Sequence, residues 1–210
     1  YTPKIDFLPV DLFYLILLGI IIGILAEIYC RYIITMQKKG NAWFKNKFIF
    51  RMTLSGIIIG SFYSALPDTF HHLNELQNLI AEGEATLFLS LSTFIILFIS
   101  TGIAAASGAP GGLFYPMLIL GGSIGLASGI WIENFTGYVP NTFIFAGMGG
   151  FIAACSRTPI TAMFLAFALT KDLLILKPLL IACIASFLTS RLLNEHSIYE
   201  RQISMEYSDK

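Results

Sequence analysis

The segment 107–117, with the sequence SGAPGGLFYPM, carries the residue types most able to form a binding site. It interrupts an apolar run, residues 85–132, that contains no Asp, Glu, Lys, Arg or His. Three glycines and two prolines break what would otherwise be two membrane helices, and lipid cannot satisfy the backbone groups that such a break leaves unpaired. We therefore expect this segment to be buried in protein or to line a wet cavity, and we interpret it as a cradle for an anion.

The backbone itself supplies the chemistry of this cradle. A helix that starts near Phe114 presents the N–H groups of Leu113, Phe114 and Tyr115, together with the positive end of its dipole. Gly111 and Gly112 permit a tight turn and positive φ values. Partial charges of this kind hold an anion moderately, whereas a buried Lys or Arg would release it slowly. A packing kink between closely fitted helices is the alternative on composition alone.

The elements that must position this segment are membrane helices. Hydrophobic residues make up 56% of the 210 residues, charged residues only 12%, and the mean hydropathy is +0.75, which is far from the composition of a soluble domain. Long helices are expected at residues 12–36, 48–66, 85–106, 113–132 and 173–193, and two pieces at 142–154 and 158–170 are too short to cross a bilayer. The 13 basic and 13 acidic residues cancel, so no basic surface for nucleic acid is expected.

Other polar residues offer weaker candidates. Glu27 and Arg31 are four residues apart, so they can pair on one face of a helix. His71, His72 and Glu75 could hold a metal on one helical turn, but no further ligand lies nearby and a solvated loop is the preferred interpretation. Gly56 and Gly60 have the spacing that permits close helix contacts. The three cysteines lie in apolar segments and form no C-x-x-C pair, so we expect free, buried thiols.

Three motifs resemble one known family. The sequence GLFYP at 112–116 is similar to the G-x-F-x-P signature of the CLC chloride channels and chloride/proton antiporters, and SGAPGG at 107–112 fits the residues that precede it. AGMGG at 146–150 and RTPIT at 157–161 resemble the next block of that family. Tyr199 falls where the family places a tyrosine whose hydroxyl reaches the central chloride.

The resemblance implies an all-α integral membrane fold of broken and tilted helices, in which residues 1–210 form the second inverted-repeat half of a CLC-type membrane domain. It implies chloride binding by the N–H groups of Leu113 and Phe114 and by the Tyr199 hydroxyl, with Gly111, Gly112, Tyr115 and Pro116 shaping the loop around the anion. Neither a metal nor a cofactor is implied, and the protein is not expected to be an enzyme.

The partners implied by the resemblance are chloride, protons in an antiporter, the lipid bilayer, a second copy in a homodimer and the N-terminal half of the same transporter. The G-S-G-I-P and G-[RK]-E-G-P motifs of that first half, and any soluble regulatory domains, are absent from these 210 residues. The expected location is the inner (plasma) membrane of a bacterium.

Several functions stay open at this point. A CLC-type protein is either an antiporter or a (voltage-gated type) chloride channel, and the ion could be fluoride or another anion. A non-transporting assembly subunit of a membrane complex and an intramembrane hydrolase with Ser107 as nucleophile are alternatives from other classes.

Overall fold

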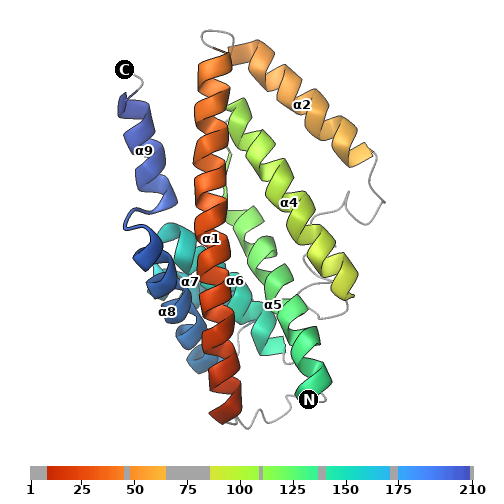
Figure 1. The fold of residues 1–210 in the computed structure, drawn as a ribbon, viewed down its shortest axis with the longest axis vertical. Helices are drawn as coiled ribbons and strands as arrows, with labels where there is room; N and C mark the ends of the chain where they lie inside the picture. Colours follow the sequence, from red (N-terminus) through yellow and green to blue (C-terminus); the bar gives the residue numbers. More distant parts are fainter. Residues whose placement is uncertain are drawn as a thin grey trace.

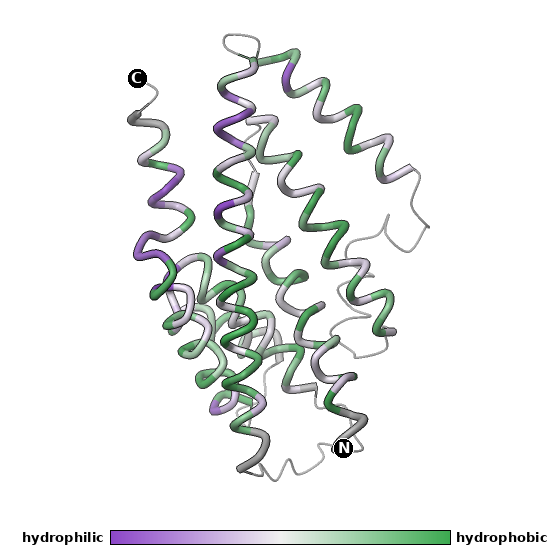
Figure 2. Tube along the Cα trace, in the orientation of Figure 1, coloured by the Kyte–Doolittle hydropathy of each residue, from purple (hydrophilic) through white to green (hydrophobic). Residues whose placement is uncertain are grey.

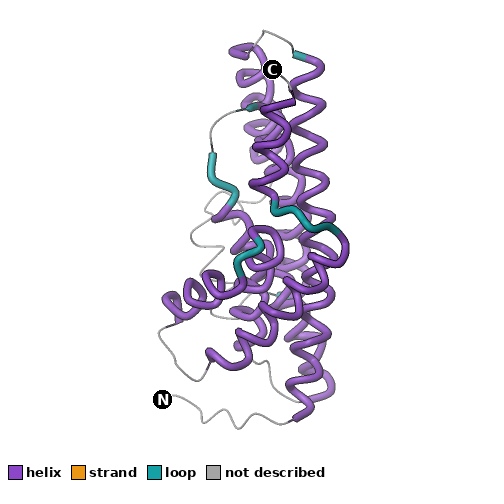
Figure 3. Tube along the Cα trace, turned by 90° about the vertical axis from the view of Figure 1, so that its left-hand side faces the viewer, coloured by secondary structure: helices purple, strands orange, loops and turns teal. Residues whose placement is uncertain are grey.

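The long helix α1 (Pro9–Trp43) runs the full height of the molecule and organises the other helices around it (Figure 1). The structure is a computed structural model that describes residues 9–44, 48–64, 86–108, 111–136, 141–170 and 175–208. Helices make up nearly all of this described part, and no strand occurs in it (Figure 3). The all-α fold implied by the family resemblance is confirmed.

The remaining helices cover two sides of α1. On one side lie α2 (Phe48–Ser64), α4 (Leu87–Ser107) and α5 (Phe114–Thr136), and on the other lie α7 (Pro159–Thr170), α8 (Leu176–Leu193) and α9 (Ile198–Ser208), with α6 (Asn141–Ser156) behind α1. α6 packs against both α5 and α8, so it joins the two sides behind α1. The end of α9 and the last turns of α1 lie at the same end of the molecule (Figure 1).

Length and composition make four segments able to cross a membrane: Leu12–Trp43, Leu87–Ser107, Phe114–Ile132 and Leu176–Met205, the last of which covers α8 and most of α9. α6 and α7 have 16 and 12 residues. At 1.5 Å per residue they are shorter than a bilayer core of about 30 Å, as the sequence predicts. Hydrophilic residues are concentrated in the second half of α1 and along α9 (Figure 2).

Two sequence-based boundaries need correction. The first helix continues through the basic stretch after residue 36 and ends at Trp43, because lysine and glutamine are good helix formers even where the lipid-facing pattern stops. The polar terminal segment forms the helix α9, for which no helix was predicted.

Close helix contacts also lie elsewhere than expected. No atom of the described chain lies within 4 Å of a Cβ built on Gly56 or Gly60, so this pair brings no described helix close. The tight contacts are made by Gly121 of α5 and Gly147 of α6, each of which would direct a Cβ into the carbonyl oxygen of the other. Gly19 and Gly23 likewise face the backbone of α8.

Candidate anion-binding site

The break between α4 and α5 begins with a left-handed residue. Gly108 has φ 74°, and its N–H donates to the Ala105 carbonyl at 3.2 Å, which closes the last turn of α4. A side chain in this conformation is strained, so glycine is the residue that fits here. We expected positive φ values at Gly111 and Gly112. Among the described residues the glycine with positive φ is Gly108, at the start of the break, and not Gly111 or Gly112.

A buried arginine from a different helix stabilises this turn. Arg51 of α2 donates from Nε to the Ser107 carbonyl at 2.7 Å and from Nη1 to Asn41 Oδ1 at 2.6 Å. Its guanidinium lies so close to Gly108 that a Cβ there would overlap it. A cation at the C-terminus of α4 complements the negative end of the helix dipole. The apolar run 85–132 therefore contains no charged residue of its own, but the positive charge of Arg51 lies against it in the folded protein.

The second half of the break begins α5. Leu113 accepts a hydrogen bond from the Met117 N–H at 3.1 Å, so it stands at the N-cap and Phe114 is the first helical residue. Within the described chain, the N–H groups of Leu113 and Phe114 have no hydrogen-bond partner. The helix starts where the sequence predicts, with two backbone donors and the positive dipole end at one point.

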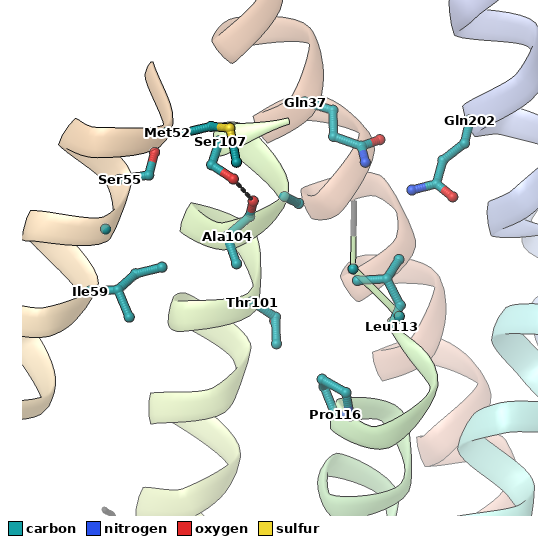
Figure 4. A pocket seen from close by; sticks show the side chains of 14 residues that line it. Gln37, Met52, Ser55, Ile59, Thr101, Ala104, Ser107, Leu113, Pro116 and Gln202 are labelled. Atoms are coloured by element: carbon teal, nitrogen blue, oxygen red, sulfur yellow. Dashed lines mark hydrogen bonds between the residues drawn. The ribbon is translucent and has the colours of Figure 1, made fainter. Parts of the chain in front are cut away.

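A cavity of about 340 Å³ lies beside this helix start (Figure 4). Gly111, Gly112, Leu113 and Pro116 line it on the side of the break. The other lining residues come from four different helices and include Gln37 of α1, Ser55 and Ile59 of α2, Thr101 of α4 and Gln202 of α9. The predicted anion loop thus borders a cavity, as expected for a break that cannot face lipid.

Two of the polar residues at this cavity were missed by the sequence analysis. Gln37 and Gln202 lie together on one side of it in the view of Figure 4, and Gln37 Oε1 is buried without a hydrogen-bond partner in the described structure. A carboxamide can present either its oxygen or its NH₂ group, so these side chains can donate into the cavity. Nothing in their local sequence distinguishes them from surface glutamines.

Tyr199 lies on α9, the same helix that brings Gln202 to the cavity. Its side chain is 42% exposed and does not line the cavity. No hydrogen bond in the described structure joins it to Leu113 or Phe114. The start of α9 is well defined, because Glu200 accepts from the Ser197 N–H at 2.7 Å and Ser197 Oγ accepts from the Glu200 N–H at 3.2 Å, which forms a capping box.

The hydrolase alternative finds no catalytic arrangement in the described residues. Ser107 Oγ donates to the Ala104 carbonyl at 2.6 Å, and His196 is exposed and contacts Glu200 instead. His71, His72 and Glu75, the weak metal candidates, lie outside the described residues. Elsewhere in the described chain no three His, Cys, Asp or Glu side chains come together, and Cys30, Cys155 and Cys183 are free and buried as predicted.

Comparison with known proteins agrees with the fold and the motifs. The sequence profile described as "Voltage gated chloride channel" matches residues 1–191. The H(+)/Cl(-) exchange transporter ClcA of Vibrio parahaemolyticus is 31% identical over 193 residues, which are 89% of this chain and 41% of the relative. The protein of the same name from Cronobacter sakazakii is 31% identical over 198 residues, 88% of this chain and 41% of the relative.

Solved structures show the same arrangement of helices. A slow cyanobacterial Cl-/H+ antiporter matches with a TM-score of 0.83 and 24% identity, over 100% of this chain and 50% of that one. A eukaryotic CLC transporter matches with a TM-score of 0.77 and 19% identity, over 97% of this chain and 36% of that one.

The chain belongs to the voltage-gated chloride channel (CLC) family. It spans about two fifths of the length of the curated relatives that it matches. Its apolar helices and these bacterial relatives identify it as an integral protein of the inner membrane.

Proposed function

We propose that this chain forms the C-terminal half of the membrane domain of a chloride transporter. In this proposal it supplies half of a central anion site, which consists of the N–H groups of Leu113 and Phe114 and the Tyr199 hydroxyl, within the loop that also contains Gly111, Gly112, Tyr115 and Pro116. The observation that carries the proposal is the start of α5, where two backbone donors without partners meet the positive dipole end beside a cavity.

The groups around the start of α5 are suited to binding an anion and releasing it again. Arg51 does not line the cavity, and its Nε and Nη1 atoms donate to Ser107 and Asn41, so the anion would meet backbone and hydroxyl dipoles at this helix start. Binding by dipoles is strong enough to remove part of the hydration shell and weak enough to allow release. The remaining ligands would come from the N-terminal half of the same transporter.

The relatives named as H(+)/Cl(-) exchange transporters favour antiport over a channel, and we propose exchange of chloride for protons. The proposal includes a homodimer with one pathway per subunit, in which α1, α7 and α8 contribute to the subunit interface. The exposed apolar residues Ile160 and Phe164 of α7 and Leu188 of α8 are compatible with such a contact. Protons, chloride, the second subunit and the lipid are the partners, and no enzymatic reaction is proposed.

Chloride efflux from liposomes that contain the full-length protein tests the site. Phe114→Pro removes one backbone donor at the first helical position, where proline is well tolerated, and Phe114→Ala keeps that donor. Tyr199→Phe removes only the hydroxyl. Each lost donor to a charged partner should cost about 1.5–3 kcal/mol, so we expect chloride binding to weaken roughly 10- to 100-fold in Phe114→Pro and Tyr199→Phe.

Matched controls come from exposed or distant positions. Phe88→Ala on the exposed face of α4 and Tyr14→Phe in the first half of α1 should leave efflux unchanged. Absence of chloride flux in folded wild-type protein would refute transport, and equal effects of Phe114→Ala and Phe114→Pro would refute the backbone donor. The same vesicles loaded with fluoride, bromide or nitrate test the alternative anions, and a shift of the reversal potential with the proton gradient separates antiport from a channel.

A further inference from the structure

A buried carboxylate in α1 binds the helix that carries Tyr199. Glu27 is 2% exposed. Arg201 of α9 makes a bidentate contact with its carboxylate, at 2.6 Å from Nη2 to Oε2 and 3.1 Å from Nη1 to Oε1. Arg31 adds a bond from Nε to Oε1 at 2.8 Å, which confirms the pair predicted from the i, i+4 spacing. Bidentate contacts between a guanidinium and a carboxylate fix the relative orientation of the two groups as well as their distance.

Arg157 completes the cluster from the connection between α6 and α7. Its Nη2 lies 3.5 Å from Glu27 Oε2. The same guanidinium donates to the carbonyls of Ala154 (2.7 Å), Ser190 (3.0 Å) and Asn194 (2.7 Å), and also to Ser190 Oγ. It therefore binds the C-terminal ends of α6 and α8 at once.

The charges of the cluster balance without an added anion. Arg157 and Arg201 are about nine-tenths buried, whereas Arg31 is 62% exposed and is neutralised largely by solvent. Against the two buried cations stand the Glu27 carboxylate and two helix C-termini of about half a negative charge each. The cluster therefore joins α1, α6, α8 and α9 through a carboxylate and arginines whose charges are balanced within the protein.

The Arg201–Glu27 contact limits the rotation of α9 about its own axis. Among the described side chains of α9, Arg201 is the one that hydrogen-bonds to another helix, through its two bonds to Glu27. Ile198, which is fully buried, is three residues before Arg201 and lies on the same face of the helix. Tyr199 is adjacent to Ile198, so two fixed points on one face determine the direction in which its side chain leaves the helix.

We propose that Glu27, acting through Arg201, is the positioning residue that directs the Tyr199 hydroxyl toward the anion. A tyrosine hydroxyl stands at the end of a long side chain, so a small rotation of α9 moves it farther than a hydrogen bond tolerates. This inference rests on the proposed anion site and adds a residue that does not touch the anion itself. Arg157 holds the other side of the carboxylate, so that α9 is placed relative to α6 and α8 as well as α1.

Chloride affinity measured by titration calorimetry on the detergent-purified, full-length protein tests the inference. Arg201→Lys keeps the positive charge but loses the bidentate contact with Glu27, and Arg201→Gln loses both the charge and that contact. We expect both variants to bind chloride about tenfold more weakly than the wild type, the usual scale of coupling between neighbouring residues. Arg191→Gln is the matched control, because Arg191 is an exposed arginine at the end of α8 that lies over the Phe187 ring.

The double variant Arg201→Gln/Tyr199→Phe separates positioning from general stability. If Arg201 acts through the tyrosine, Arg201→Gln should weaken chloride binding no further once the hydroxyl is gone. Full additivity of the two effects, or unchanged affinity in both Arg201 variants, would overturn the inference. Failure of both Arg201 variants to give folded protein would assign the pair to folding and would overturn it too. Loss of the proposed site itself gives a different result, namely no weakening by Tyr199→Phe alone.

Discussion

Arg51 contacts the break between α4 and α5 although it is far from it in sequence. The arginine is 56 residues from Ser107, whose carbonyl it binds, and it lies on a helix that the hydropathy pattern treats as an ordinary membrane segment. The sequence predicted where the chain breaks and which residues begin α5. It could not predict that a cation reaches the break, because contacts over such separations depend on how the helices pack.

Removing this arginine should loosen the turn. In Arg51→Met the aliphatic stem is kept, but the buried Ser107 carbonyl loses the hydrogen bond from Arg51 Nε, which should cost about 1–3 kcal/mol. We expect a lower midpoint of thermal unfolding in detergent and weaker chloride binding, since the loop that leads to Leu113 is less well held. Arg191→Met, an exposed counterpart, should change neither property. An unchanged unfolding midpoint in Arg51→Met would contradict the stabilising role of the Arg51–Ser107 bond.

At the scale of elements, α9 shows both what the sequence contained and what was overlooked. Its residues are polar on average, so the hydropathy pattern did not predict a helix here. The pattern Ser197-Ile198-Tyr199-Glu200 is nevertheless a serine followed three residues later by a glutamate, which is the sequence signature of a capping box. That local signal predicts the start of α9. The anchoring of α9 to Glu27, 174 residues away from Arg201, has no local signal.

The contact between α5 and α6 yields an element-scale prediction. In Gly147→Ala the new methyl group would collide with the Gly121 carbonyl, a backbone atom that cannot turn aside. We expect the helices to separate slightly, at a cost of about 1–3 kcal/mol, with a corresponding fall in the unfolding midpoint. Gly60→Ala is the control, because the described structure leaves that position open. A Gly147→Ala variant as stable as wild type would mean that the two helices have more freedom than their packing indicates.

For the whole molecule, composition alone was sufficient to predict a bundle of apolar helices, and the motifs were sufficient to predict its family. The predicted helices at residues 85–106 and 142–154 differ from α4 and α6 by one or two residues at each end, because apolar runs there coincide with helix limits. The pairing of helices was beyond the sequence, since apolar side chains pack equally well against many partners. The spacing at Gly56 and Gly60 illustrates this, for it suggested a contact that the described chain does not make.

The integrity of the core can be followed through its cysteines. Cys30, Cys155 and Cys183 are each at most 1% exposed and come from three different helices, α1, α6 and α8. We expect no labelling by a maleimide in the folded protein and complete labelling after denaturation in SDS. A cysteine introduced in place of exposed Ser64 is the positive control for reagent access. Labelling of a native cysteine without denaturation would mean that these helices separate on the time scale of the reaction.

The cluster around Glu27 also has a consequence for the order of events during synthesis. Arg201 is made 174 residues after Glu27. At about 5–20 residues per second the ribosome needs roughly 9–35 s to reach it. Throughout that interval the carboxylate is already part of an apolar helix entering the bilayer, where an unpaired charge is costly. Arg31, one turn away on the same helix, is a cation available from the start. The most exposed arginine of the cluster is thus the one that can accompany Glu27 into the membrane before its final partners exist.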